Sequence, residues 1–282
     1  LQNVGPDGLV SSRMVTHDGV ASLVADERID HVAFTGSVAG GRAVQRAAGE
    51  RFISVGLELG GNDPAYIAQD VDVEYAAANV VEGACYNAGQ SCCAVERVYV
   101  HRSIHQDFVK AAARHLQALA LGNPLDAGTD IGPLANPAHL AFLQSHVDDA
   151  ITRGATLVCG GSTKDDRFYL PTLLDGCPND ARVMQEESFG PLVPILMVEN
   201  DDEALAHFND TTFGLTASIW TQDRARAEWF AQRHDTGTLF QNRCDYADPL
   251  LPWSGCRDTG RGASLSRYGY HALTRRTSTH FR

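Results

Sequence analysis

The sequence predicts an α/β protein with a largely parallel sheet, on the basis of two observations. Short apolar segments alternate with amphipathic ones along the chain, which is typical of repeated strand–helix units. Hydrophobic residues make up 44% of the 282 residues, enough to bury one or two sizeable cores. The chain shows no internal repeat and no low-complexity tract, so we expect a globular protein and not a fibre or a disordered chain.

The individual elements follow from local pattern. Apolar or alternating runs of β-prone residues predict strands, and apolar residues that recur at helical spacing predict helices. The expected strands are residues 31–35, 54–59, 95–101, 156–159, 193–198, 216–221 and 238–241. The expected helices are residues 38–48, 71–87, 107–119, 136–153, 202–208 and 224–234. Because strands and helices alternate, neighbouring strands are expected to run parallel.

Residues at the helix ends refine these boundaries. Asp70 is predicted to cap the helix that follows it, and Gly89 lies just past the end of that helix. The run from Ser103 to Gln106 has the spacing of a capping box, which predicts a helix directly after it. Pro137 is expected in the first turn of the next helix.

Composition excludes several classes of function. The 35 acidic residues outnumber the 23 Lys and Arg and give a net charge of -12, so nucleic acid is not an expected partner. No apolar run approaches the roughly 20 residues that cross a bilayer, so no membrane span is expected. The seven cysteines are scattered and not spaced as metal ligands, which favours free thiols, no metal site and a reducing compartment such as the cytoplasm.

Cys92 is a candidate nucleophile. A reactive cysteine must be exposed and held as thiolate, and a helix end that opens into a tight glycine turn can present a side chain in that way. The segment from Gly89 to Cys93 occupies such a place. The alternative is that Cys92 and Cys93 are both small buried hydrophobes, as most free cysteines are.

Glu58 is a candidate general base. It ends an expected strand with apolar neighbours, just before Gly60 and Gly61, so we expect partial desolvation. Desolvation raises the pKa of a carboxylate toward the range in which it takes a proton from water. The alternative is a surface glutamate on a loop.

The turn around Gly36 and Ser37 is a candidate phosphate site. It lies between an expected strand and an expected helix, where free backbone N–H groups and the helix N-terminus suit a pyrophosphate. Gly40 and Gly41 follow, but the spacing is not G-x-G-x-x-G, so the standard dinucleotide fingerprint is absent.

Five short motifs occur in order along the chain, and together they resemble the aldehyde dehydrogenase superfamily. They are Phe-Thr-Gly-Ser at 34–37, Leu-Glu-Leu-Gly-Gly at 57–61, Gly-Gln-Ser-Cys-Cys at 89–93, Glu-Glu-Ser-Phe-Gly-Pro at 186–191 and Phe-Gly-Leu at 213–215. Glu58 and Cys92 are 34 positions apart, which also suits that family. The resemblance covers essentially the whole chain, which is similar to the C-terminal part of a family member.

The resemblance implies roles for individual residues. Cys92 matches the nucleophile and Glu58 the general base. The positions that match cofactor-binding residues are Gly36 and Ser37 beside the phosphates, Leu59 and Gly60 near the nicotinamide, and Glu187 and Phe189 at the nicotinamide ribose and ring. The implied cofactor is NAD or NADP, and the implied substrate is a small-molecule aldehyde.

Four further residues are candidates for the substrate site. Tyr86 and Trp253 fall where the family often places aromatic walls of the aldehyde tunnel, although both also suit a hydrophobic core. Asp245 and Tyr246 lie on an expected loop, residues 242–251, that borders the substrate mouth in such proteins.

The implied reaction is a two-stage oxidation of an aldehyde to a carboxylate. The Cys92 thiolate forms a thiohemiacetal, hydride passes to the nicotinamide, and Glu58 activates water to hydrolyse the thioester. A catalytically silent fragment that serves as a binding or structural subunit is the alternative. A papain-like thiol hydrolase would need a partner histidine, and the eleven histidines show no flanking motif for that role.

The resemblance also implies a division into three parts. Residues 1–59 would be the remnant of a Rossmann-like cofactor domain, residues 60–257 an α/β catalytic domain, and residues 258–282 a C-terminal oligomerisation tail of a homodimer or homotetramer. The polar alternation at 274–281 is a candidate for pairing with another chain's sheet edge. Because the chain starts at Leu1, we expect an N-terminal segment with further cofactor residues to be missing. Asn62 stands where many members have Lys.

Overall fold

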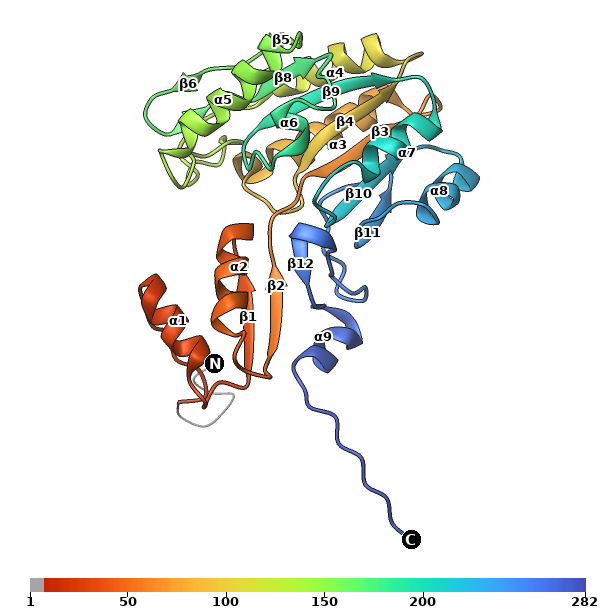
Figure 1. Cartoon of the computed structure of the whole chain (residues 1–282). Coiled ribbons are helices and arrows are strands. Elements are labelled where there is room, and N and C mark those ends of the chain that lie inside the picture. Colours follow the sequence, from red (N-terminus) through yellow and green to blue (C-terminus); the bar gives the residue numbers. More distant parts are fainter. Residues whose placement is uncertain (1–7) are drawn as a thin grey trace.

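The computed structural model describes residues 8–282, which form a large and a small sheet joined by short connections (Figure 1). The large sheet has the order β11 (Thr238–Gln241), β10 (Thr216–Trp220), β3 (Asp63–Ile67), β4 (Val95–His101), β9 (Leu192–Val198), β8 (Thr172–Asp175) and β5 (Thr156–Cys159). The small sheet has the order β1 (His31–Thr35), β2 (Ser54–Glu58) and β12 (Gly260–Arg261). Two further short strands, β6 (Thr163–Lys164) and β7 (Phe168–Tyr169), form a hairpin.

The strand directions confirm the predicted α/β fold class. Every neighbouring pair in the large sheet is parallel except β5 with β8. In the small sheet β1 and β2 are parallel, and β12 returns antiparallel to β2. The predicted largely parallel sheet is therefore present, with antiparallel strands at one edge of each sheet.

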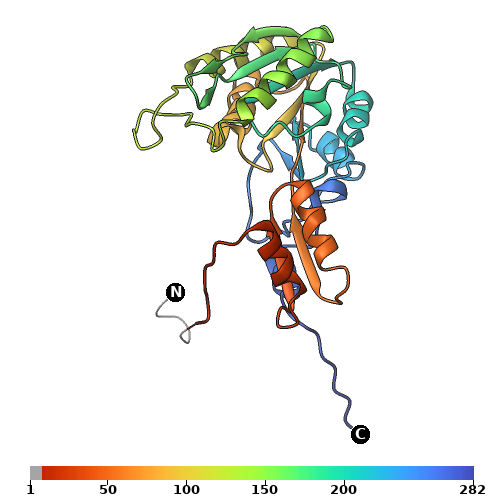
Figure 2. The ribbon, with the colours of Figure 1, turned by 60° about the vertical axis from the view of Figure 1, so that its left-hand side comes forward.

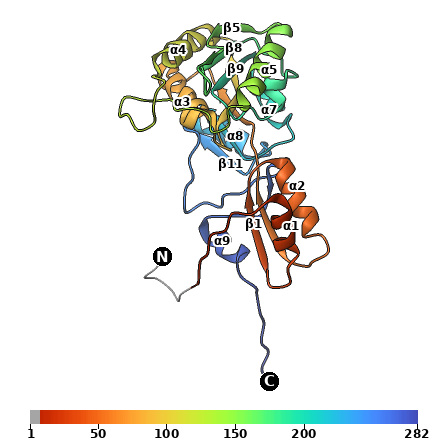
Figure 3. The same ribbon diagram turned by 90° about the vertical axis from the view of Figure 1, so that its left-hand side faces the viewer.

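Helices cover both faces of the large sheet. They are α3 (Val73–Cys85), α4 (His105–Ala118), α5 (His139–Thr152), α6 (Arg182–Gln185), α7 (Asp201–Asn209) and α8 (Arg224–Ala231). Figure 3 shows α3 and α4 on one face and α5 and α7 on the other. The small sheet is accompanied by α1 (His17–Ala25), α2 (Val38–Ala47) and α9 (Ser266–Ala272). The short 3-10 helices are η1 (Tyr86–Gly89) and η2 (Arg257–Thr259).

Strand β4 lies at the centre of the large sheet and is the most deeply buried long strand. Its residues from Val95 to Val100 are all buried, including two with charged side chains. Parallel strands covered by helices on both faces are expected to be apolar throughout, because neither face meets water. Glu96 and Arg97 are therefore exceptions that need internal partners.

The two sheets are connected where β2 passes into β3. Leu59 N donates to Thr259 O at 2.9 Å, and the Thr259 hydroxyl donates to Gly60 O at 2.8 Å. The same hydroxyl accepts from Gly214 N at 3.0 Å. One buried threonine thus ties the exit of β2 to the segment before β10, and it fixes where the end of the small sheet meets the large one.

Three predicted helix starts are wrong. Pro137 is not in the first turn of α5, because that helix begins at His139 with Ala138 as its cap residue. The side chain of Asp72, and not Asp70, caps α3 by accepting from Tyr75 N at 3.1 Å. The Asp70 carboxylate instead accepts from the N–H groups of residues 222 and 223 and pairs with Arg226. The predicted capping box also fails, because α4 begins at His105 and Ser103 Oγ hydrogen-bonds to His101 Nδ1 at 2.8 Å.

All seven expected strands are present, but β3, β6, β7, β8, β12, α1, α6 and α9 were not predicted. Strand β3 begins with Asp63 and Pro64, a pair that in sequence favours a turn. Residues 274–282 form no helix or strand and extend away from both sheets (Figure 2). Their pairing with another chain stays a prediction.

Arg97 is expected to stabilise the fold more than an exposed arginine does. Its side chain is 0% exposed and donates to Asn62 O at 2.8 Å and to His207 O and Phe208 O at the end of α7. The Arg97→Met variant leaves these carbonyls without a donor, so the free energy of unfolding should fall by about 3 kcal/mol in chemical denaturation. Arg224→Met, which removes one exposed i,i+4 pair, should change it by less than about 1 kcal/mol. Equal losses would contradict this role for Arg97.

Candidate active site

A tight reversal of the backbone after α3 presents Cys92. Helix α3 ends at Cys85, and Asn87, Ala88 and Gly89 then adopt left-handed conformations with φ of 51°, 58° and 74°. A Cβ at Gly89 would overlap the carbonyl of Gly190, so only glycine fits there. The turn packs against the 186–191 segment and delivers Cys92 just before β4.

The two adjacent cysteines have different environments. Cys92 is half-buried, whereas Cys93 is buried and its Sγ lies 2.6 Å from Asp245 Oδ1. A hydrogen bond with Cys93 holds the pKa of the Cys92 thiol below its usual value, against the opposing effect of burial. The same contact and burial raise the pKa of Cys93. Of the pair, Cys92 is the thiol that ionises more readily, which is the property a nucleophile requires.

Gly60 and Gly61 bring three motifs into contact. A Cβ at Gly61 would overlap the carbonyl oxygen of Cys92, and a Cβ at Gly60 would overlap the carboxylate of Glu187. Glu187 Oε1 accepts from Gly61 N at 2.9 Å, and burial raises the pKa of Glu187. The absence of side chains at these two positions is what allows Cys92 and Glu187 to approach the same stretch of backbone.

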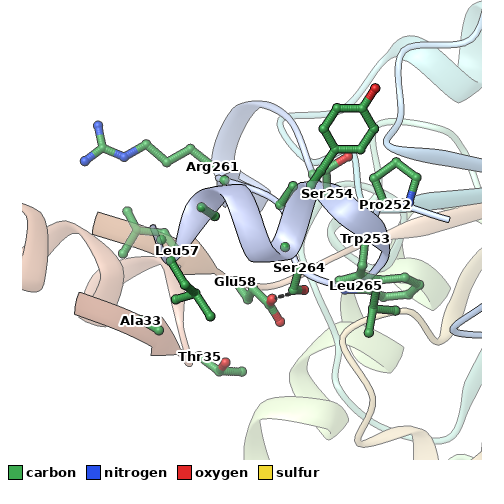
Figure 4. Close-up of a pocket in the computed structure, with 18 of the residues that line it drawn as sticks. Ala33, Thr35, Leu57, Glu58, Pro252, Trp253, Ser254, Arg261, Ser264 and Leu265 are labelled. Atoms are coloured by element: carbon green, nitrogen blue, oxygen red, sulfur yellow. Dashed lines mark hydrogen bonds between the residues drawn. The ribbon is translucent and has the colours of Figure 1, made fainter. Parts of the chain in front are cut away.

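Glu58 and Cys92 line one cavity of about 1040 Å³ between the small sheet and the C-terminal segment. Leu59 and Trp253 also line it, and Ser264 Oγ donates to Glu58 Oε1 at 2.5 Å (Figure 4). The predicted desolvation of Glu58 is wrong, because its side chain is exposed. The carboxylate lies at the end of a three-stranded sheet whose face opens to the cavity.

The candidate phosphate turn lies beside Glu58. Gly36 N donates to Glu58 O at 3.1 Å, and Thr35 and Glu58 are partners in the β1–β2 register. Ser37 Oγ accepts from Gly40 N at 3.1 Å and caps α2. The N-terminus of α2 therefore lies at the carboxyl ends of two parallel strands, a place where α/β proteins commonly bind ligands.

Glu96 was not identified from the sequence, and its carboxylate binds backbone N–H groups of the 186–191 segment. Phe189 has φ of 50°, and its N–H donates to Glu96 Oε1 at 2.7 Å, next to a bond from Ser188 N at 2.9 Å. Burial raises the pKa of Glu96 to about 7. The available signal was the presence of two adjacent charged residues, Glu96 and Arg97, inside a mostly apolar expected strand.

The candidate substrate residues are only partly brought together. Trp253 lines the cavity, and Asp245 lies next to the cysteines through its contact with Cys93. Tyr86 is exposed and outside the cavity lining. Tyr246 is also outside the lining, and its ring lies under the guanidinium of Arg243, at 3.6 Å from the ring centre.

Within residues 8–282 no group of three or more His, Cys, Asp or Glu is placed to hold a metal ion. In the same part of the chain no helix has the length and apolar character needed to cross a membrane. The one described histidine that lines the cavity is His31, at the start of β1 and four residues along the strand from Thr35.

The fold arranges the five ordered motifs around one junction. The sequence profile of the aldehyde dehydrogenase family matches residues 4–279, and the chain belongs to this family. An aldehyde dehydrogenase of Paenarthrobacter nicotinovorans is 37% identical over 266 residues, which cover 94% of this chain and 58% of that protein. The NADP(+) succinate-semialdehyde dehydrogenase 1 of Mycobacterium tuberculosis is 35% identical with the same coverage.

Solved structures agree with this assignment. The NAD-dependent aldehyde dehydrogenase from Sinorhizobium meliloti superposes with a TM-score of 0.87 and 34% sequence identity. The match covers 90% of this chain and 51% of that protein. The chain thus spans 58% of the length of the two relatives above and about half of this solved structure.

Removal of Cys93 should make Cys92 harder to ionise. In Cys93→Ala the hydrogen bond that lowers the Cys92 pKa is lost, whereas the opposing burial and the Asp245 charge remain. The pH midpoint of Cys92 alkylation by iodoacetamide, followed by peptide mass spectrometry, should therefore move to higher pH. Cys159→Ala, on the edge strand β5, should leave the midpoint unchanged. A midpoint that stays or falls in Cys93→Ala would show that Cys93 does not assist the thiolate.

A side chain at Gly61 should disturb the junction. The added Cβ meets the backbone of Cys92, which cannot rotate away, so Gly61→Ala should lower the free energy of unfolding by about 1–3 kcal/mol. The rate of Cys92 alkylation should change as well, because the nucleophile turn must shift. Gly128→Ala is the matched control, since no heavy atom lies within 4 Å of its added Cβ. If Gly61→Ala and Gly128→Ala behave equally in denaturation and in alkylation, the contact between Gly61 and the Cys92 backbone does not constrain the junction.

Proposed function

We propose that this site oxidises a small-molecule aldehyde to a carboxylate with NAD or NADP. The observation that carries the proposal is that Cys92 and Glu58, from two ordered family motifs, line the same cavity. The lowered pKa of Cys92 supports the role of nucleophile, and the exposed position of Glu58 gives its carboxylate access to water.

The residues present suit the nicotinamide and phosphate portions of a dinucleotide. Gly36 and Ser37 stand at the N-terminus of α2, whose first N–H groups have no carbonyl partner within the helix and favour phosphate oxygens. Glu187 and Phe189 would hold the ribose and the ring, with Leu59 and the side-chain-free Gly60 alongside. When bound, the dinucleotide supplies the hydride acceptor.

The residues of the chain perform the other steps. The Cys92 thiolate attacks the aldehyde carbon, and the backbone N–H of Cys92 is one donor to the oxyanion that forms. Loss of hydride leaves a thioester on Cys92. Glu58 takes one proton from water, the water oxygen attacks the thioester carbon, and the C–S bond breaks so that Cys92 leaves as thiolate. The carboxylic acid that is released loses the second water proton to solvent and becomes the carboxylate.

The substrate is proposed at the level of its class only. Trp253 would form an apolar wall of the cavity, and Asp245 would border the nucleophile. Tyr86 and Tyr246 would act at the outer approach, since neither lines the cavity. One relative is named for NADP and one solved structure is named for NAD, so we propose either dinucleotide as the cofactor of this chain.

The three-part division also stays a proposal. The small sheet would belong to a cofactor domain ending near residue 59, and residues 60–257 would form the catalytic domain. Residues 258–282 would serve a homodimer or homotetramer, although Gly260 and Arg261 pair with β2 of their own chain.

Activity measurements on the chain and two variants test the proposed function. Aldehyde-dependent reduction of NAD or NADP, followed by absorbance, should disappear in Cys92→Ala. In Glu58→Gln the steady-state rate should fall by about 10²-fold or more, while the first turnover still produces reduced cofactor, because hydride loss precedes hydrolysis. Cys159→Ala should retain the activity. Activity that survives in Cys92→Ala would contradict the mechanism. No activity in any of the proteins would favour the alternative, a silent binding subunit. The hydrogen bond between Ser264 and Glu58 suits that alternative, because it already occupies one oxygen of the Glu58 carboxylate.

A further inference from the structure

We propose that Glu96 is a positioning residue that fixes the 186–189 loop, so that Glu187 and Phe189 are held ready for the nicotinamide end of the cofactor. The inference rests on the proposed function for the roles of Glu187 and Phe189. The position of Glu96 itself rests on contacts within the chain. Among the described residues, Glu96 does not line the cavity, and its carboxylate binds the backbone of the loop at residues 188 and 189.

The Glu96 carboxylate is buried at 3% exposure and accepts hydrogen bonds on both oxygens. Oε1 accepts from Phe189 N at 2.7 Å, from Ser188 Oγ at 3.0 Å and from Ser188 N at 3.1 Å. Oε2 accepts from Ser188 N at 2.9 Å and from Asn62 Nδ2 at 3.1 Å. A carboxylate with this many donors can stay buried, because each hydrogen bond offsets part of its desolvation cost.

The contacts determine the conformation of the loop. Two successive N–H groups next to a residue in the left-handed region form a concave site for an anion, and the Glu96 carboxylate fills it from within the protein. Phe189 can hold its φ of 50° because this arrangement compensates the strain. Once residues 188 and 189 are fixed, Glu187 is directed to Gly61 N.

Helix α5 supports the loop from another side but does not replace Glu96. His139 Nε2 lies 2.8 Å from Ser188 O, and His146 Nε2 lies 3.3 Å from a carboxylate oxygen of Glu186. These contacts involve a carbonyl and a side chain, whereas the N–H groups of Ser188 and Phe189 both donate to Glu96. Asn62 extends the connection to the Gly60–Gly61 junction, because its Nδ2 also lies 3.4 Å from Glu186 O.

A matched control exists in the same sheet. Asp70 also accepts from two successive N–H groups, those of Gln222 and Asp223, both at 3.0 Å. It follows β3 at the carboxyl end of the parallel strands, whereas Glu96 stands near the amino end of β4. Asp70→Asn therefore removes a comparable carboxylate without touching the 186–189 loop.

The experiment compares wild type, Glu96→Gln and Asp70→Asn by hydrogen–deuterium exchange of peptides that contain residues 186–189. The amide of Gln cannot accept from all the donors that face Glu96, so exchange in this loop should be about tenfold faster or more in Glu96→Gln. Asp70→Asn should leave the loop unchanged and speed exchange near residues 222 and 223. Unchanged loop exchange in Glu96→Gln, or an equal change in Asp70→Asn, would overturn the proposal.

Titration of the same three proteins with NADP and NAD, followed by tryptophan fluorescence, tests the link to the cofactor. The dissociation constant should rise about tenfold in Glu96→Gln and stay the same in Asp70→Asn. Faster loop exchange with unchanged affinity would overturn the positioning role. If wild type binds neither dinucleotide, the proposed function fails, and the exchange measurement still decides whether Glu96 fixes the loop.

A second variant covers the case in which Glu96→Gln does not fold. Ser188→Ala removes one donor to the carboxylate and leaves Glu96 in place. Its loop exchange should change in the same direction by a smaller factor. Exchange equal to wild type in a folded Ser188→Ala protein would count against the proposal.

Discussion

The close approach at Gly60 and Gly61 is the constraint on which the candidate site depends. A Cβ at Gly60 would occupy the space of the Glu187 carboxylate and one at Gly61 that of the Cys92 carbonyl, so three segments distant in sequence meet here, with direct backbone contact between Gly61 and Cys92. Such a junction leaves little freedom, because backbone atoms cannot change rotamer to relieve an overlap. The relative position of Cys92 and Glu187 therefore follows from the path of the chain between the two sheets.

The central strand β4 holds the surroundings of this junction together. The β3–β4 register shifts at Glu96, because Asp63 pairs with Val95 and Pro64 with Arg97. Glu96 binds the loop before β9, and Arg97 binds Asn62 O and the last carbonyls of α7. Both charges would be costly in a dry sheet, and both are matched by several partners. One strand thus fixes both the loop before β9 and the end of α7.

The fold and the site were predictable to different extents. Regular alternation, which is a local signal, predicted the seven expected strands. The family resemblance of the ordered motifs suggested one site for Cys92 and Glu58, and both residues line the same cavity. Strand β3 was missed since Asp63 and Pro64 resemble a turn, and only their burial between β10 and β4 makes them a strand. The environments of Glu58 and Glu96 depend on segments far along the chain. Glu58 is hydrogen-bonded to Ser264, and Glu96 is hydrogen-bonded to residues 188 and 189. Local sequence carries no information on such contacts.

The electrostatics of Cys92 follow from this geometry. The charges of Asp245 and Glu187 raise its pKa, and no cationic side chain is among its leading influences. What lowers the pKa is hydrogen bonding, from Cys93 and from the backbone at Cys92 itself. Hydrogen bonds of this kind act only over short distances and at defined angles, unlike the field of a cation. The ionisation of Cys92 is therefore tied to the shape of its turn, and that shape is set by the contacts of Gly89 and Gly61 with neighbouring backbone.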